Sequence, residues 1–175
     1  MSILDWLRTS AGQASAASGD TETVRRIVAE LDKLDPRRAR HLAAFAYILS
    51  RVASADLHVS EVETATMVGL VRREGDLPEA QAVLVVEIAK SQSRLSGGTE
   101  NFLVTREFRE IASEDERRAL LHCLFAVSAA DQAISAEEEA QIGQIAKELG
   151  LSHAEYVEVR LAYSGKRTVL RRDDA

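Results

Sequence analysis

The sequence has one cysteine, two prolines and few aromatic residues among its 175 positions. A single cysteine excludes a disulfide within the chain and is typical of a reducing compartment. Cys123 lies in an apolar stretch, so we expect a buried, unreactive thiol rather than a nucleophile. The scarcity of proline and the lack of any Asn-Gly or Asp-Gly pair remove the commonest hairpin signals and favour helices over strands.

Long apolar runs, targeting signals and excess positive charge are also missing. No run approaches the roughly 20 apolar residues of a membrane-spanning helix, and no secretory pattern opens the sequence, so we expect a cytoplasmic protein. The net charge of −6 argues against nucleic-acid binding, which usually needs a basic face. No phosphate-binding loop, nucleophile elbow or His-Glu-x-x-His motif occurs, so we expect no enzymatic activity.

The remaining composition fits one compact helical domain. We place this domain at residues 20–164, after an N-terminal segment and linker (1–19) and before a polar tail (165–175). Residues 2–9 have apolar side chains at helical spacing, with Trp6 among them. They predict either a short helix docked on the domain or a weak contact with a membrane surface or partner.

Helix-start signals and apolar periodicity predict an all-α fold of roughly eight or nine helices. Four Ser-x-x-Glu patterns, one Asp-Pro pair and two glycines after apolar stretches set most of the boundaries. The expected helices are 20–34, 35–55, 60–74, 76–91, 99–111, 113–130, 135–149 and 152–164.

An internal repeat organises these helices. Aligning residues 40–75 with 115–150 gives nine identities, where chance gives roughly two or three. In each copy an apolar helix ends in Ala-Asp, a turn passes through a β-branched residue and a serine, and a glutamate-bearing helix begins. The repeat halves, about 36–75 and 113–150, predict two long helices packed around a pseudo-two-fold axis, with the two Ala-Asp turns in related positions.

The repeated motif resembles that of the tellurite-resistance protein B (TerB-like) family. The family places a glutamate seven residues after the aspartate, as Asp56 with Glu63 and Asp131 with Glu138 do here. The stretches 149–152 and 101–106 also resemble family segments, and the likeness covers about residues 20–163. The family has a glycine after each aspartate, which is replaced here.

The resemblance implies an all-α bacterial protein associated with tellurite resistance and related stress responses. It also implies that acidic residues at the repeat hold a divalent cation, as is suspected for some relatives. The replacements for the family glycine are Leu57 and Gln132. They change the turn and any carbonyl ligand that it offers.

The four carboxylates of the motif are therefore candidate metal ligands: Asp56, Glu63, Asp131 and Glu138. Residues seven apart on one helix lie about 10 Å apart along the axis, but a break between them lets the two side chains converge. The pseudo-two-fold axis of the repeat would then bring all four carboxylates together. Oxygen ligands of this kind suit Ca²⁺ or Mg²⁺. Further glutamates that could enlarge the acidic patch are Glu61, Glu137 and Glu139.

The same glutamates have a purely structural interpretation. Ser60 with Glu63 and Ser135 with Glu138 are capping-box pairs, in which serine and glutamate satisfy each other's backbone N–H groups. The same pattern opens two further expected helices without a preceding Ala-Asp. An aspartate near a helix end can likewise bond turn amides. Both interpretations stay open at this point.

Other polar residues predict little function. The four histidines have no zinc-ligand spacing, and we expect them at the surface or its boundary. The arginines of 37–40 and 171–172 are expected to be solvated. The leading hypothesis is a cation-binding TerB-like protein. The second is a metal-free helical module for an unknown protein partner, with a homo-oligomer left open. The third and weakest is an enzyme using the acidic cluster.

Overall fold

The computed structural model describes residues 4–5, 9, 19–52, 61–92, 100–130 and 133–166. These residues form helices and their connections, without a regular strand, which confirms the predicted all-α class. None of the described helices is long and apolar enough to cross a membrane. The elements are α2 (Gly19–Asp32), α3 (Pro36–Val52), α4 (Glu61–Glu74), α5 (Glu79–Gln92), α6 (Glu100–Ile111), α7 (Glu114–Ala129), α8 (Ala136–Glu148), α9 (His153–Ala162) and a 3-10 turn (Ser164–Lys166).

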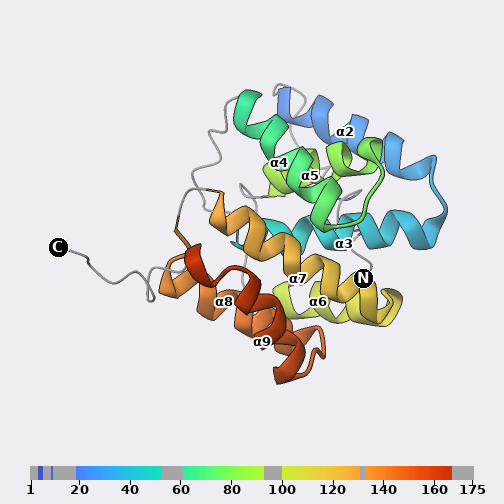
Figure 1. Ribbon diagram of the computed structural model, residues 1–175. Coiled ribbons are helices and arrows are strands. Elements are labelled where there is room, and N and C mark those ends of the chain that lie inside the picture. Colours follow the sequence, from blue (N-terminus) through green and yellow to red (C-terminus); the bar gives the residue numbers. More distant parts are fainter. Residues whose placement is uncertain are drawn as a thin grey trace.

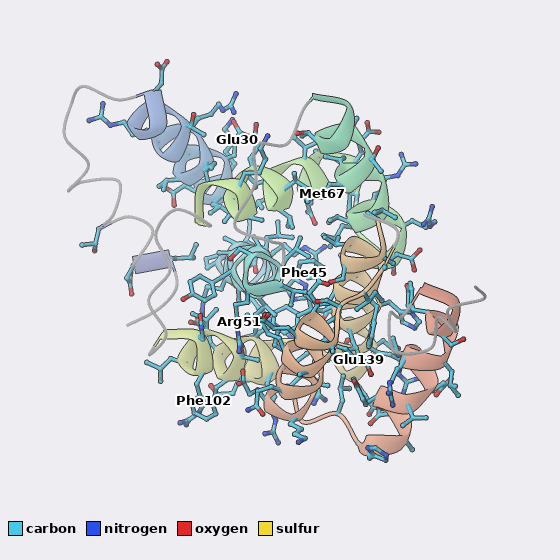
Figure 2. All side chains as sticks on the ribbon, turned by 90° about the vertical axis from the view of Figure 1, so that its left-hand side faces the viewer. Glu30, Phe45, Arg51, Met67, Phe102 and Glu139 are labelled. Atoms are coloured by element: carbon cyan, nitrogen blue, oxygen red, sulfur yellow. The ribbon has the colours of Figure 1, made fainter. Side chains whose placement is uncertain are left out.

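The helices form three layers. Helices α3 and α7 lie in the middle, with α2, α4 and α5 on one side and α6, α8 and α9 on the other (Figure 1). Every residue of α3 from position 41 to 50 is buried. A helix that is apolar on all faces needs neighbours on all sides, and α3 contacts α2, α5, α6, α7 and α8. Phe45, 1% exposed, lies at the centre (Figure 2), and burying such a side chain contributes about 1.5–3 kcal/mol.

Side-chain caps explain the helix starts. Asp35 Oδ1 accepts from the N–H groups of Arg37 and Arg38 at 3.0 and 3.3 Å, so α3 begins at the Asp-Pro pair as predicted. Full capping boxes open α7, α8 and α9 from Ser113, Ser135 and Ser152. These three starts were predicted from Ser-x-x-Glu alone, since the motif needs no tertiary partner.

The α4–α5 turn begins where the sequence predicts. Gly75 follows the last residue of α4, and the positive φ lies at the next residue, Asp76 (φ 51°). A β-carbon at Gly75 would lie 2.5 Å from Val71 O and 3.0 Å from Phe45 Cζ. Glycine is needed there for close approach. By contrast Gly150, after α8, does have a positive φ, of 72°.

In each repeat half, the second helix packs against the long helix of the other half. Helix α4 of the first half packs on α7 of the second, and α8 of the second half packs on α3 of the first. This exchange is what a pseudo-two-fold axis would produce, although the axis itself stays a prediction. Helices α3 and α7 run side by side in the same direction and end on the same side of the molecule (Figure 1).

Three sequence expectations about single side chains can now be compared with the structure. Leu4 is half-buried and packs against the hydrophobic core, as a docked N-terminal helix requires, whereas Trp6 lies outside the described residues. Cys123 is fully buried, as predicted, and burial raises the pKa of its thiol. His41 was expected near the surface, but it is 4% exposed. Its spacing along α3 places it on the face covered by α6.

The arginines at the start of α3 were expected to be solvated; Arg37 is exposed, and Arg38 and Arg40 are partly buried, but all three also bond to other helices. Residues 171–172 lie outside the described residues. Arg37 donates to Ile111 O at 2.8 Å, Arg38 donates to Gln81 Oε1, and Arg40 pairs with Glu107 at 2.8 Å. These bonds tie α3 to α5 and α6. Sequence could not predict them because each partner lies at least 43 positions away.

Candidate functional site

In the sequence, the four predicted cation ligands follow the ends of α3 and α7. Asp56 and Asp131 fall outside the described residues. Glu63 is in the first turn of α4, and its side-chain placement is not described. Glu138 alone has a described side chain. The structure therefore neither gathers nor separates the four carboxylates.

The predicted capping box is confirmed at Glu138. Its Oε2 accepts from Ser135 N–H at 2.8 Å and from Ser135 Oγ–H at 2.7 Å, while its own N–H donates to Ser135 Oγ at 3.2 Å. No hydrogen bond from a described residue reaches Oε1. Within the described ranges no three His, Cys, Asp or Glu side chains are close enough to hold a metal ion.

One glutamate expected to enlarge the acidic patch has another role. Glu139 pairs with Arg160 at 2.6 Å, and its side chain is 12% exposed. The pair joins α8 to α9. The positive charge of Arg160 therefore offsets the negative charge of Glu139.

A buried polar cluster at the end of α3 was not predicted. Arg51 Nη1 donates to Glu148 Oε2 and to Thr105 Oγ1, both at 2.7 Å, and the Arg51 and Glu148 side chains are each 9% exposed. Thr105 in turn donates to Asn101 O at 2.9 Å. The cluster joins α3, α6 and α8 at the last turn of α3. The only sequence signal was a lone charge in the apolar last turns of α3.

Burial and the contacts with Arg51 shift the pKa of Glu148 in opposite directions. Burial raises the pKa of Glu148, but hydrogen bonds and charge from Arg51 outweigh it, and the pKa lies below the ordinary value. Glu148 is thus ionised and Arg51 is not left as an isolated buried charge. Arg51 Nε is buried without a hydrogen-bond partner. The cluster fixes the end of α3, and its burial excludes direct contact with a ligand.

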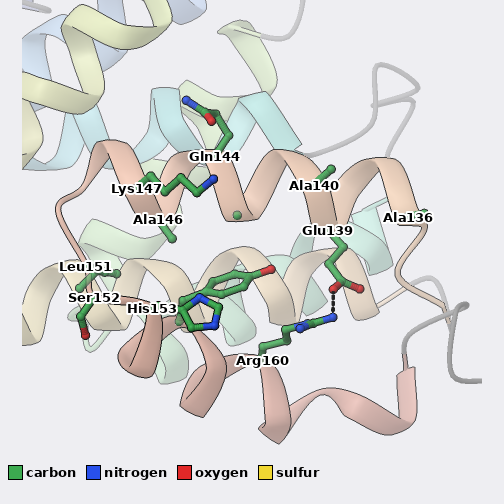
Figure 3. A pocket seen from close by; sticks show the side chains of 12 residues that line it. Ala136, Glu139, Ala140, Gln144, Ala146, Lys147, Leu151, Ser152, His153 and Arg160 are labelled. Atoms are coloured by element: carbon green, nitrogen blue, oxygen red, sulfur yellow. Dashed lines mark ion pairs between the residues drawn. The ribbon is translucent and has the colours of Figure 1, made fainter.

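A groove lies between α8 and α9 (Figure 3). It encloses about 660 Å³, within the range of small-molecule and peptide sites. Its α8 wall has small residues (Ala136, Ala140, Gly143 and Ala146) among the longer Glu139, Gln144 and Lys147, and its α9 wall includes Tyr156. The Glu139–Arg160 pair bounds one end. The lining residues are Ala136, Glu139, Ala140, Gly143, Gln144, Ala146, Lys147, Leu151, Ser152, His153, Tyr156 and Arg160.

Comparison with known proteins identifies the fold's family. The family model described as Tellurite resistance protein TerB matches residues 41–161. The chain belongs to the TerB family. The match includes both Ala-Asp segments of this TerB-family chain and runs from α3 into α9. No curated protein and no solved structure matches the chain.

Acid stability gives a first test of the caps in this TerB-family protein. Bonds from the Ser152 Oγ–H and N–H, and then from Arg118, lower the pKa of Glu155 to about 2. A carboxyl with a lowered folded-state pKa stabilises the fold above its unfolded value near 4.5, and this contribution is lost as the pH falls toward 2. We expect the free energy of unfolding to fall over that interval. Denaturant titrations at a series of pH values measure it.

The control for that titration is Glu155→Gln, which keeps an amide oxygen for Ser152 but cannot titrate. We expect a smaller loss of stability in this variant between pH 4.5 and 2. Identical pH profiles in parent and variant would contradict the assigned role of Glu155.

Proposed function

We propose that this TerB-family chain is a non-enzymatic cytoplasmic protein that binds a divalent cation through Asp56, Glu63, Asp131 and Glu138. Its setting would be a tellurite-type stress response, as the family description suggests. Ca²⁺ and Mg²⁺ fit an all-oxygen ligand set best. The two repeat halves would each supply one aspartate and one glutamate.

One observation carries the proposal: α3 and α7 pack against each other, run in the same direction and end on the same side (Figure 1). α3 ends at Val52 and α7 at Ala129, so Asp56 and Asp131 follow by four and two residues. Aligned helices direct both C-terminal carbonyl ends to that side, and negative dipole ends favour a cation. This arrangement supports two aspartates close to one ion.

The capping bonds of Glu138 are compatible with ligation. Both bonds from Ser135 reach Oε2, and a carboxylate has lone pairs on the other oxygen. The cap also holds the side chain in one orientation, which reduces the ordering that ion binding requires. We therefore infer that the capping and ligand roles of Glu138 act together.

Thermal unfolding in EDTA, and then with excess Ca²⁺ or Mg²⁺, tests the proposal. A cation at 100 times its dissociation constant stabilises the native state by about 2.7 kcal/mol. We expect the melting temperature to rise with the cation in the parent. The Asp56→Asn/Asp131→Asn double variant should lose this rise.

The matched control is Glu137→Gln, which removes an exposed first-turn carboxylate of α8 outside the proposed ligand set. It should respond to the cation like the parent. If neither ion shifts the parent, or the double variant keeps the full shift, the cation proposal is wrong.

The α8–α9 groove favours a second candidate, a helical module for a protein partner. Its small-residue wall, about 660 Å³ hollow and largely apolar lining suit an inserted helix or loop. Ala140→Arg would fill the groove, and Ala154→Arg adds the same charge on α9 outside the lining. Binding of an isolated partner that Ala140→Arg abolishes and Ala154→Arg retains would support the module. Equal binding by both variants would exclude the groove.

A further inference from the structure

Helices α8 and α9 form an antiparallel pair on the two sides of the α8–α9 groove. Glu139, early in α8, pairs with Arg160, late in α9, at 2.6 Å, and the two side chains bound one end of the groove. Lys147 and His153 line the other end (Figure 3). The described chain continues past Arg160 to Lys166. The next segment of the chain, residues 167–174, therefore starts from the Glu139 end of the groove.

The groove has an exposed apolar surface along α8. Ala136, Ala140 and Gly143 share one face of this helix, and both alanines are exposed. A β-carbon at Gly143 would lie 3.4 Å from Tyr156 Oη, so the tyrosine of α9 lies directly opposite this face. A segment with one or two apolar side chains would remove this surface from water, which is favourable.

The two ends of the groove carry opposite charges. The first turn of α8 holds Glu137, Glu138 and Glu139, and of these only Glu139 pairs with an arginine that the structure describes. At the other end Lys147 is exposed, and its ammonium group makes no ion pair with a described residue. An occupant that enters at the Glu139 end is therefore favoured if its basic residues come first and its acidic residues last.

The segment after α9 has this order of charge. The basic residues 166–167 are followed by the apolar residues 169–170 and then by the acidic residues 173–174. The two arginines at 171–172 have long side chains that can extend to solvent. The segment therefore matches both the apolar surface of the groove and the charges at its two ends.

The length of the segment also fits. On α8 the rise from Ala136 to Lys147 is about 16 Å, and an extended chain covers about 3.3 Å per residue. An extended segment that starts beside Ala136 would place Leu170 level with Gly143. It would place residues 173–174 beside Lys147. The apolar and acidic parts thus reach their counterparts in one register.

We propose that residues 167–174 occupy the α8–α9 groove of their own chain, with Leu170 between Ala140 and Tyr156 and residues 173–174 beside Lys147. Because the segment is joined to α9 at the groove, its local concentration is on the order of millimolar, which favours the same chain over a second copy. The contact is independent of the cation site. A protein partner of the groove would have to displace it, so the segment is autoinhibitory.

A nitroxide label on Ala175→Cys, with paramagnetic broadening of amide signals in the full chain as the readout, tests this contact. The native Cys123 is fully buried, so the label attaches to the new cysteine. We expect the strongest broadening at Lys147 and His153, at the end of the groove far from the start of the segment.

Two other occupancies give different patterns. A segment that is only tethered at the end of α9 would broaden Glu137 and Gly165 most. A segment that enters the groove of a second copy would broaden signals in an isotope-enriched, unlabelled chain mixed with labelled chain of natural isotope content. We expect no broadening in that mixture.

Two pairs of variants locate the contact. Leu170→Asn removes the apolar anchor, and Thr168→Asn is its polar control. Ala140→Leu fills the groove, and Ala154→Leu adds the same side chain to α9 outside the lining; both alanines are exposed, so neither change should prevent folding. Leu170→Asn and Ala140→Leu should lose the selective broadening at Lys147, and their controls should keep it.

Three results would each overturn the proposal. The first is broadening that is strongest at Glu137 and Gly165, and the second is broadening that passes between chains in the mixture. The third is selective broadening at Lys147 that persists in Leu170→Asn or in Ala140→Leu.

Discussion

Glu148→Ala is expected to lower the free energy of unfolding by about 3–5 kcal/mol, because it leaves Arg51 charged, buried and unpaired. Both side chains are 9% exposed and joined at 2.7 Å. Thr105 can keep only one of the Arg51 bonds. Urea titration monitored by circular dichroism measures the change, with the slope compared between variants to check two-state unfolding.

Glu110→Ala is the matched control for Glu148→Ala. It removes the same residue type from an Arg–Glu pair, but Arg106 and Glu110 are 64% and 61% exposed. Such a surface pair contributes about 0.3–0.5 kcal/mol. The double variant Arg51→Met/Glu148→Leu should recover most of the stability lost in Glu148→Ala, since it removes both charges. If Glu148→Ala costs no more than Glu110→Ala, the buried cluster does not stabilise the fold.

The second large effect concerns the turn between α4 and α5. Gly75→Ala should lower the free energy of unfolding by about 1–3 kcal/mol, as overpacking in a filled core does. The added β-carbon would lie 2.5 Å from Val71 O, a backbone atom, and 3.0 Å from the buried ring of Phe45. Neither can move freely. Thermal and urea unfolding of the parent and variant measure the difference.

Gly69→Ala, within α4, is expected to have the opposite effect. A β-carbon at Gly69 meets nothing within 4 Å, and alanine is better than glycine inside a helix by about 0.5–1 kcal/mol. This variant should be more stable than the parent. If Gly75→Ala and Gly69→Ala change the free energy of unfolding by the same amount and in the same direction, close packing at Gly75 does not lower the stability of the variant.

The contrast between these glycines and the caps explains what sequence could predict. Ser113, Ser135 and Ser152 open helices through bonds within four residues of chain, so their positions follow from local sequence. Arg51 with Glu148 spans 97 positions, and His41 is buried by α6. Such contacts depend on the packing of whole helices, which no local pattern specifies.

At the candidate site, too, local features were predicted from the sequence and long-range contacts were not. Sequence identified Glu138, and its capping bonds follow from Ser135 three residues before it. The contact between α3 and α7 was expected from the repeat. By contrast, the ion pair of Glu139 with Arg160 and the groove beside it depend on how α9 packs against α8, and sequence did not predict them.

Binding of Mn²⁺, followed by paramagnetic broadening of amide signals in the full chain, tests the cation proposal most directly. The proposed site predicts early, selective broadening at Val52, Ala129, Ser135 and Glu138, which flank the two Ala-Asp segments. Excess Mg²⁺ should reverse it, and Asp56→Asn/Asp131→Asn should abolish it. Uniform weak broadening, or broadening centred elsewhere on the chain, would contradict a cation held between the two repeats.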